Sequence, residues 1–185
     1  MDTLIIFVIA LALAMDCFTI AISNSSVSGL VKPGIPLKVA IAFAFAHMVF
    51  VMAGYWLANA IRHMFEGMEA LMAFAVLGII GSKMILEARR RHPKSKVFDI
   101  NQIRIIVFLS LATAMDAFLA GLAIGFARMS FYVSVILITF TVFVLTLAGM
   151  AGGSRLGMDF ARRTAYFGGI FMMMAAAVIL FRIIA

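Results

Sequence analysis

The sequence is poor in charge, in cysteine and in proline. Only 12% of its 185 residues are charged, about half the share of an ordinary soluble domain. A single cysteine, Cys17, excludes an intrachain disulfide framework. The N-terminus lacks the basic stretch of a secretory signal peptide, so we expect the first apolar run to be retained. With 65% hydrophobic residues, this composition excludes a soluble domain and indicates an integral membrane protein in a lipid bilayer.

Several functional signatures are also missing. The chain has no nucleotide-binding loop, no HExxH motif and no serine nucleophile elbow, so we expect no enzymatic activity and no cofactor. The net charge of +7 does not indicate a nucleic-acid partner, because the basic residues lie between apolar runs, where they set membrane orientation. Nothing in the sequence specifies an oligomeric state.

The apolar runs predict an all-α, polytopic membrane protein with six transmembrane helices. A spanning helix needs about 20 apolar residues, and the runs cover residues 3–24, 38–60, 70–88, 103–127, 131–153 and 164–184. The connections after the first, third and fifth runs hold 11 Lys and Arg residues, against three on the opposite side. The positive-inside rule then places both termini outside and the basic 89–104 loop in the cytoplasm.

A repeated motif divides the chain into two halves. LALAMDCFTIAI at 11–22 matches LATAMDAFLAGL at 111–122 in six of twelve positions, so Asp16 has a counterpart in Asp116. We therefore expect one membrane domain of two three-helix repeats, 1–88 and 103–185, joined by a basic linker, 89–102. Because three spans are an odd number, the repeats are predicted to be inverted, as in many secondary transporters.

The two aspartates are the strongest candidates for chemistry. A carboxylate within the bilayer costs a few kcal/mol, and by chain position both lie near the membrane midplane. Two carboxylates in a low dielectric repel each other, and a divalent cation or protons would relieve that repulsion. The alternative for each aspartate is a structural hydrogen bond or a pair with a fixed cation such as Lys83.

Other polar residues could assist such a site. His47, at mid-span, is a candidate metal ligand or proton carrier, or only a packing residue. Lys83 and Glu87, four residues apart, can pair with each other or reach the membrane surface. Cys17 points away from Asp16 around the helix and is expected to face elsewhere. Possible supporting oxygens come from Asn24, Thr141 and Thr146, and glycines expected at helix contacts are Gly54, Gly121, Gly125 and Gly149.

Three segments carry a family resemblance. Met15-Asp16-Cys17-Phe18, Gly81-Ser82-Lys83-Met84-Ile85-Leu86-Glu87 and Thr113-Ala114-Met115-Asp116-Ala117 resemble, in this order, the MntP-type manganese efflux pumps, small six-helix proteins of the bacterial inner membrane. The resemblance implies export of Mn²⁺ from the cytoplasm, with Asp16 and Asp116 handling the metal as substrate. Because the chain has no nucleotide-binding loop, we expect an ion gradient to drive this export. This chain departs from the family at two positions. Relatives usually carry Glu or Gln at the position of His47, and Pro four residues later at the position of Val51.

Two alternatives remain open at this stage. Because the imidazole of His47 is a softer ligand than a carboxylate, Fe²⁺, Co²⁺ or Zn²⁺ could be co-substrates. The chain could also export some other divalent cation or a small cationic solute. The chain could also be a non-transporting membrane subunit, in which case the aspartates would affect only folding.

Overall fold

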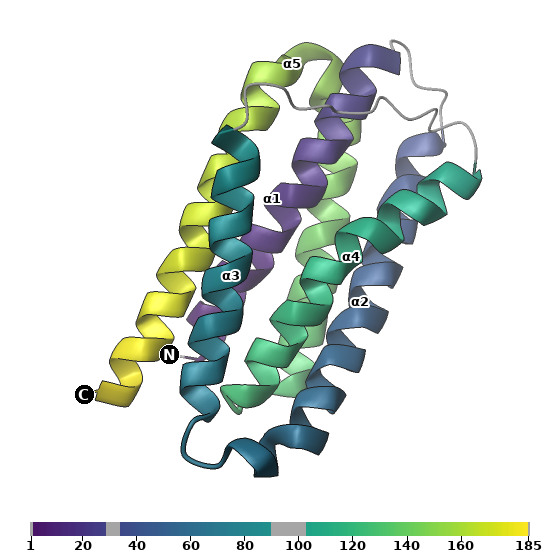
Figure 1. The fold of residues 1–185 in the computed structure, drawn as a ribbon. Coiled ribbons are helices and arrows are strands. Elements are labelled where there is room, and N and C mark those ends of the chain that lie inside the picture. Colours follow the sequence, from purple (N-terminus) through teal and green to yellow (C-terminus); the bar gives the residue numbers. More distant parts are fainter. Residues whose placement is uncertain (1, 29–33, 90–102, 185) are drawn as a thin grey trace.

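The computed structural model describes residues 2–28, 34–89 and 103–184, and these contain helices and no strands. The elements follow one another as antiparallel rods in a single bundle (Figure 1). They are α1 Asp2–Ser28, α2 Ile35–Ile61, the short 3-10 helix η1 Arg62–Phe65, α3 Glu69–Arg89, α4 Ile103–Phe126 and α5 Phe131–Ile184.

Six segments of these helices are long and apolar enough to cross a membrane. Four belong to α1 to α4, and α5 supplies two, Phe131–Gly153 and Arg163–Phe181. The predicted all-α protein with six spans is confirmed. In Figure 1, α1 begins and α5 ends at the same end of the bundle, as an even number of spans requires.

The connection between the last two spans differs from the prediction. We expected a basic linker with Arg155, Arg162 and Arg163 to separate two helices, but α5 is helical over all 54 residues. A straight helix of this length would measure about 80 Å, far more than the ~30 Å hydrocarbon core. Figure 1 shows α5 folding back on itself at the end of the bundle opposite the termini, so one helix crosses twice.

The turn from α4 to α5 is tight, because α4 ends at Phe126 and α5 begins at Phe131. Arg128 has a positive φ of 54°, and the amide of Met129 donates to the carbonyl of Ile124 at 3.1 Å. A left-handed residue closed by this six-residue hydrogen bond is a Schellman-type helix end, where glycine is usual. Arg128 also pairs with Glu69 at 2.5 Å, which ties the turn to the start of α3.

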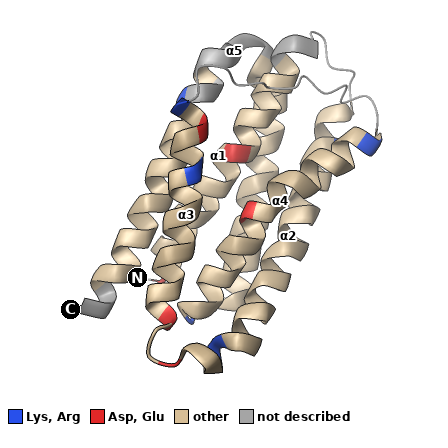
Figure 2. Ribbon diagram, viewed as in Figure 1, with Lys and Arg blue, Asp and Glu red and all other residues tan. Residues whose placement is uncertain are grey.

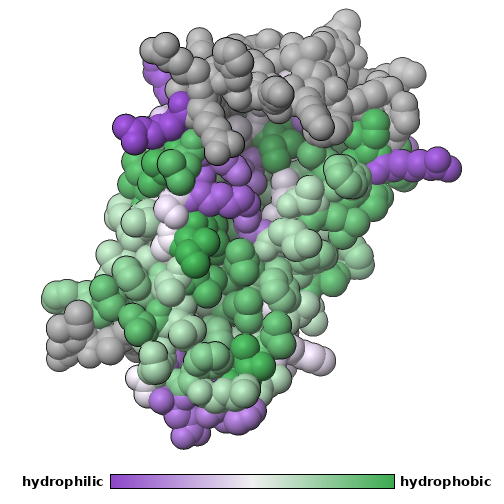
Figure 3. All heavy atoms as spheres, viewed as in Figure 1, coloured by the Kyte–Doolittle hydropathy of each residue, from purple (hydrophilic) through white to green (hydrophobic). Residues whose placement is uncertain are grey.

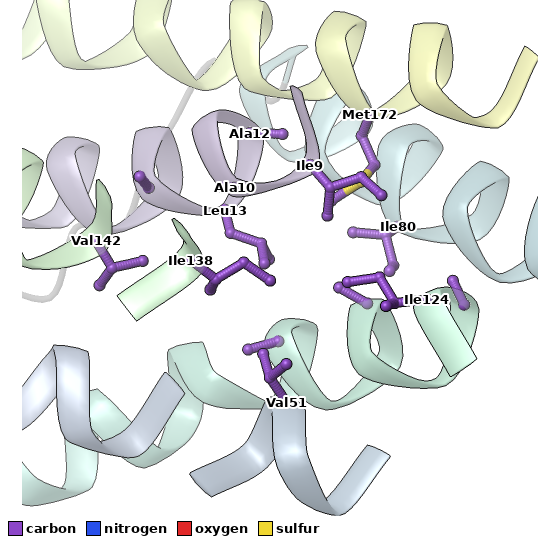
Figure 4. Close-up of a cluster of buried hydrophobic side chains, with 14 of the residues drawn as sticks. Ile9, Ala10, Ala12, Leu13, Val51, Ile80, Ile124, Ile138, Val142 and Met172 are labelled. Atoms are coloured by element: carbon purple, nitrogen blue, oxygen red, sulfur yellow. The ribbon is translucent and has the colours of Figure 1, made fainter. Parts of the chain in front are cut away.

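The interior is filled by branched apolar side chains from every span. Figure 4 shows Ile9 and Leu13 of α1 meeting Val51 of α2, Ile80 of α3, Ile124 of α4, and Ile138 and Met172 of α5, and all seven are buried. Large apolar side chains also cover much of the outside, where Phe45, Phe108 and Tyr132 are more than half exposed. Figure 3 shows this apolar surface, which suits contact with lipid.

Candidate functional site

Both aspartates of the repeated motif lie inside the bundle. Asp16 is on α1 and is half-buried, and Asp116 is on α4 and only 9% exposed. The small residues beside them, such as Ala12 and Ala120, are fully buried and allow close helix packing. Figure 2 shows acidic segments on α1, α3 and α4 in the half of the bundle where α5 folds back.

Asp116 is held by a lysine from the neighbouring helix. The ammonium Nζ of Lys83, on α3, donates to Oδ1 of Asp116 at 2.7 Å and to Oδ2 at 3.0 Å. The side chain of Lys83 is 47% exposed and that of Asp116 is 12% exposed. The sequence left three possibilities open for Lys83: a pair with Glu87, a position at the membrane surface, or a pair with one of the aspartates. The structure shows the pair with an aspartate, and among the described residues Lys83 makes no ion pair with Glu87. An ammonium shared by two carboxylate oxygens in a poorly hydrated site is the stronger interaction.

Asp16 lies within electrostatic reach of three other charges. Asp116 and Glu87 repel its carboxylate and Lys83 attracts it. Within the described residues, Asp16 makes no ion pair shorter than 4 Å and no side-chain hydrogen bond of its own. Three carboxylates and one ammonium carry a formal charge of −2 when all four groups are ionised, which is the charge that one divalent cation balances.

His47 is held by two contacts and is almost completely buried. Its Nδ1 lies 2.9 Å from the carbonyl oxygen of Phe43, and its Nε2 lies 3.4 Å from Sγ of Cys17 on α1. A carbonyl can only accept, so Nδ1 carries the proton and Nε2 presents its lone pair to the thiol. Cys17 therefore turns toward α2, and its sulfur, next to Asp16 in the sequence, lies against one imidazole nitrogen of His47.

The described residues contain no group of three or more His, Cys, Asp or Glu side chains placed to hold a metal. Asp16, Asp116 and His47 thus share one region of the bundle without forming a closed coordination sphere. Their assignment as metal ligands remains a prediction.

The predicted supporting oxygens fall into two groups. Asn24 is buried and its amide donates to the carbonyl of Ile20 at 2.9 Å, within the last turns of α1. Thr141 and Thr146 are buried on α5. In the described part of the chain, the hydroxyl of Thr146 is buried and has no hydrogen-bond partner, and the same is true of Thr139. A buried hydroxyl normally makes a hydrogen bond, so among the described residues the hydroxyl of Thr146 has an unused bonding capacity inside the bundle.

The glycines lie where helices approach each other closely. A Cβ on Gly54 would collide with the carbonyl oxygen of Phe118, and a Cβ on Gly121 with that of Val51. A Cβ on Gly125 would lie 2.6 Å from Cβ of Ala58. Glycine at these three positions therefore permits backbone contact between α2 and α4, next to Asp116.

The same packing recurs between α1 and the first span of α5. A Cβ on Gly149 would lie 2.8 Å from the ring of Phe18 and 3.1 Å from its carbonyl oxygen. Phe18 and Phe118 are equivalent in the repeated motif, and Gly54 and Gly149 are each the second residue of an Ala-Gly dipeptide. Each half of the chain therefore packs its second span on the first span of the other half.

A cavity lies at the far end of the bundle from these charges. Its lining includes Asp2, Glu69, Phe126, Arg128 and Ile179. The ion pair between Glu69 and Arg128 lies at its edge, so this cavity is separate from the region of Asp16 and Asp116.

The sequence indicated both aspartates and the lysine, and it offered a pair between an aspartate and Lys83 as one alternative, but it did not indicate which aspartate. It gave no sign of the contact between Cys17 and His47. Residues 30 apart on different helices, as Cys17 and His47 are, meet only through tertiary packing.

Known proteins resemble this chain along nearly its full length. Residues 31–180 match the family Mntp, described as "Putative manganese efflux pump". Proteins named "Putative manganese efflux pump MntP" are similar in Phocaeicola vulgatus, 29% identical over 97% of this chain and 96% of that protein, and in Elusimicrobium minutum, 29% identical over 97% of both chains. One from Methanothermobacter thermautotrophicus is 29% identical over 97% of this chain and 96% of its own. No solved structure matches.

Proposed function

This chain belongs to the Mntp family of manganese efflux pumps, and on that premise we propose that it exports Mn²⁺ from the cytoplasm across the inner membrane. The observation that carries the proposal is the placement of Asp16 and Asp116, from two helices of a six-span bundle, within electrostatic reach of each other. Carboxylate oxygens are the ligands that Mn²⁺ prefers. The ion is the substrate, and the two carboxylates are its proposed ligands.

We further propose that the two halves form inverted repeats that move against each other around this site. The exchange of packing partners supports the idea, because Gly54 meets Phe118 as Gly149 meets Phe18. In transporters built this way, rocking of one repeat against the other exposes a central site to each side in turn. The two aspartates would then face the cytoplasm and the exterior alternately.

The proposed energy source is an ion gradient, with protons as the exchanged ion. Two neighbouring carboxylates are relieved of their repulsion by one divalent cation or by protons, so the same pair can carry either. In proteoliposomes with an imposed pH gradient, we expect added Mn²⁺ to accelerate dissipation of that gradient, measured with a pH-sensitive dye. A gradient that decays at the same rate with and without Mn²⁺ would contradict proton exchange.

The first experiment is uptake of radiolabelled Mn²⁺ by inverted membrane vesicles. We expect Asp16→Asn and Asp116→Asn each to abolish uptake, because an amide retains the size of the side chain and loses the charge that binds the ion. Asp2→Asn, the same substitution at the other end of α1, is the matched control and should transport normally. If the two inner variants transport like wild type, the aspartates are not the site. If purified wild-type protein moves no ion in liposomes, the chain is a non-transporting membrane subunit.

A second candidate function is export of a softer divalent ion, and the contact between His47 and Cys17 favours it. Nitrogen and sulfur suit Zn²⁺, Co²⁺ and Fe²⁺ better than Mn²⁺, and a hydrogen bond from Nδ1 to a carbonyl is the usual support for a histidine ligand. Competition by each ion in the vesicle assay, with wild type and Cys17→Ala, separates the candidates. If Zn²⁺, and no other ion, ceases to compete in Cys17→Ala, then the contact between His47 and Cys17 determines which ions the protein selects.

A further inference from the structure

We propose that Lys83 is the resident cation of the site: its ammonium neutralises Asp116, and the transported ion displaces it toward Glu87. This inference rests on the proposed function and adds to it a residue that sets affinity and release. Lys83 would not bind the ion. It would compete with the ion for the same carboxylate.

The geometry of the pair carries the argument. Nζ of Lys83 contacts both oxygens of Asp116, at 2.7 and 3.0 Å. A divalent ion that uses either oxygen therefore approaches a positive charge held at hydrogen-bond distance, and it must displace that charge or share the carboxylate with it. The side chain of Lys83 is 47% exposed, so it has room to leave, whereas that of Asp116 is 12% exposed and is fixed in place.

Glu87 provides the place to which the ammonium can move. It lies four residues after Lys83 on α3, the spacing at which a lysine and a glutamate meet on a helix surface. Glu87 is exposed and its charge already acts on Lys83. A swing of about one helical turn toward the end of α3 would exchange Asp116 for Glu87 as the partner of the ammonium, without leaving its charge unpaired.

The surroundings are suited to such an exchange. Figure 3 shows hydrophilic side chains gathered on one face of the bundle, bordered by apolar ones. Asp16 attracts the same ammonium from α1, and the carboxylates of Asp16, Asp116 and Glu87 together exceed its charge by two. With Lys83 on Glu87, Asp16 and Asp116 are left with two negative charges for one divalent ion. When Lys83 returns to Asp116, it weakens the hold on that ion and favours release.

The test compares Mn²⁺ binding with Mn²⁺ turnover in the purified full-length protein. Lys83→Met removes the competing charge and keeps a side chain of similar length. We expect the Kd for Mn²⁺, from calorimetry, to fall about tenfold or more, and turnover in proteoliposomes to fall because release is slowed. Lys83→Arg keeps the charge and offers a fork that grips a carboxylate more firmly, so it should bind Mn²⁺ no more tightly than wild type. Lys38→Met, the same change at an exposed lysine of α2, is the matched control.

A purely structural role for Lys83 predicts the opposite sign. If the lysine only positions Asp116, Lys83→Met would weaken Mn²⁺ binding, and that result would overturn the inference. If Lys83→Met does not fold, Glu87→Gln provides an independent test. This variant removes the alternative partner of the Lys83 ammonium, and we expect it to raise the Kd for Mn²⁺ several-fold. An unchanged Kd would count against the exchange of partners. If wild-type protein binds and transports Mn²⁺ while Lys83→Met binds no more tightly, this inference alone fails. If wild type binds no Mn²⁺, the proposed function fails as well.

Discussion

At the scale of single residues, Asp16 and Asp116 hold equivalent places in a repeated motif but have different partners. Asp116 shares the ammonium of Lys83 through both oxygens. The ammonium of Lys83 attracts Asp16 only from a longer distance, and the carboxylates of Asp116 and Glu87 repel it. The site is therefore asymmetric in charge, and one aspartate is stabilised more than the other.

This asymmetry predicts different effects on stability. Asp116→Asn removes the partner of Lys83, and we expect it to lower the free energy of unfolding by about 1–3 kcal/mol. Asp16→Asn removes a carboxylate that is partly desolvated and repelled, so it should be neutral or stabilising. Thermal melting of both variants in detergent tests this, and equal losses in the two would contradict the asymmetry.

Thr146 gives a second prediction at this scale. Its buried hydroxyl has no partner within the described residues, so replacing it by the isosteric valine removes an unsatisfied polar group. We expect Thr146→Val to raise the free energy of unfolding by about 1 kcal/mol. The control is Thr113→Val. The hydroxyl of Thr113 donates to the carbonyl oxygens of Leu109 at 3.1 Å and Ser110 at 3.0 Å, so its removal should not raise the free energy of unfolding. If Thr146→Val is destabilising, the hydroxyl has a partner in the folded protein.

At the scale of helices, close packing is set by glycine. α2 and α4 approach until a Cβ on Gly54 would overlap the backbone of Phe118, and α4 carries Asp116 on the adjoining turns. In a membrane the helices gain little from apolar burial against lipid, so close contact of this kind is a main source of association. The position of Asp116 therefore depends on small residues in a different span.

Gly54→Ala should separate these two helices. A methyl group at Gly54 has no space, and we expect a loss of about 1–3 kcal/mol in the free energy of unfolding, typical of overpacking. Gly78→Ala is the matched control, since a Cβ there would meet nothing within 4 Å, and alanine favours the helix. Thermal melts of the two variants give the comparison. Similar melting temperatures would mean that the α2 and α4 contact adjusts without cost.

At the scale of the whole molecule, the distribution of basic residues predicts the direction of the bundle in the membrane. The end of α1, the start of α2, the end of α3 and the start of α4 lie at the end of the bundle where α5 folds back, and η1 and the α4 to α5 turn lie at the other end. The count of Lys and Arg predicts that the first end is cytoplasmic. This orientation decides which way the proposed site opens for export.

Cysteine labelling tests the orientation. In a Cys17→Ala background, we expect a cysteine introduced by His63→Cys in η1 to react with a membrane-impermeant maleimide added to intact cells. A cysteine introduced by Lys96→Cys, in the basic 89–104 loop, should react only in inverted vesicles. Lys96 lies outside the described residues, and its expected side follows from the sequence alone. The reverse labelling pattern would place the termini in the cytoplasm.

The sequence by itself determined the class of the protein, its six spans and its two unusual carboxylates. These follow from composition and spacing, because apolar runs of about 20 residues must become helices in lipid. An isolated acid in such a run, as Asp16 and Asp116 are, is visible without any structure. The family resemblance, carried by short motifs, is confirmed by the match over residues 31–180.

Only the tertiary structure decided which side chains meet. Lys83 could pair along its own helix or across to another, and packing of α3 beside α4 brought it to Asp116. His47 met Cys17 for the same reason, since rotation and depth of two helices fix contacts that spacing along one chain does not. The helical connection within α5 also lay beyond the sequence, because basic residues between two spans fit a loop and a helix equally well. Local patterns specify helices in a membrane, and close packing at small residues specifies which polar groups share a site.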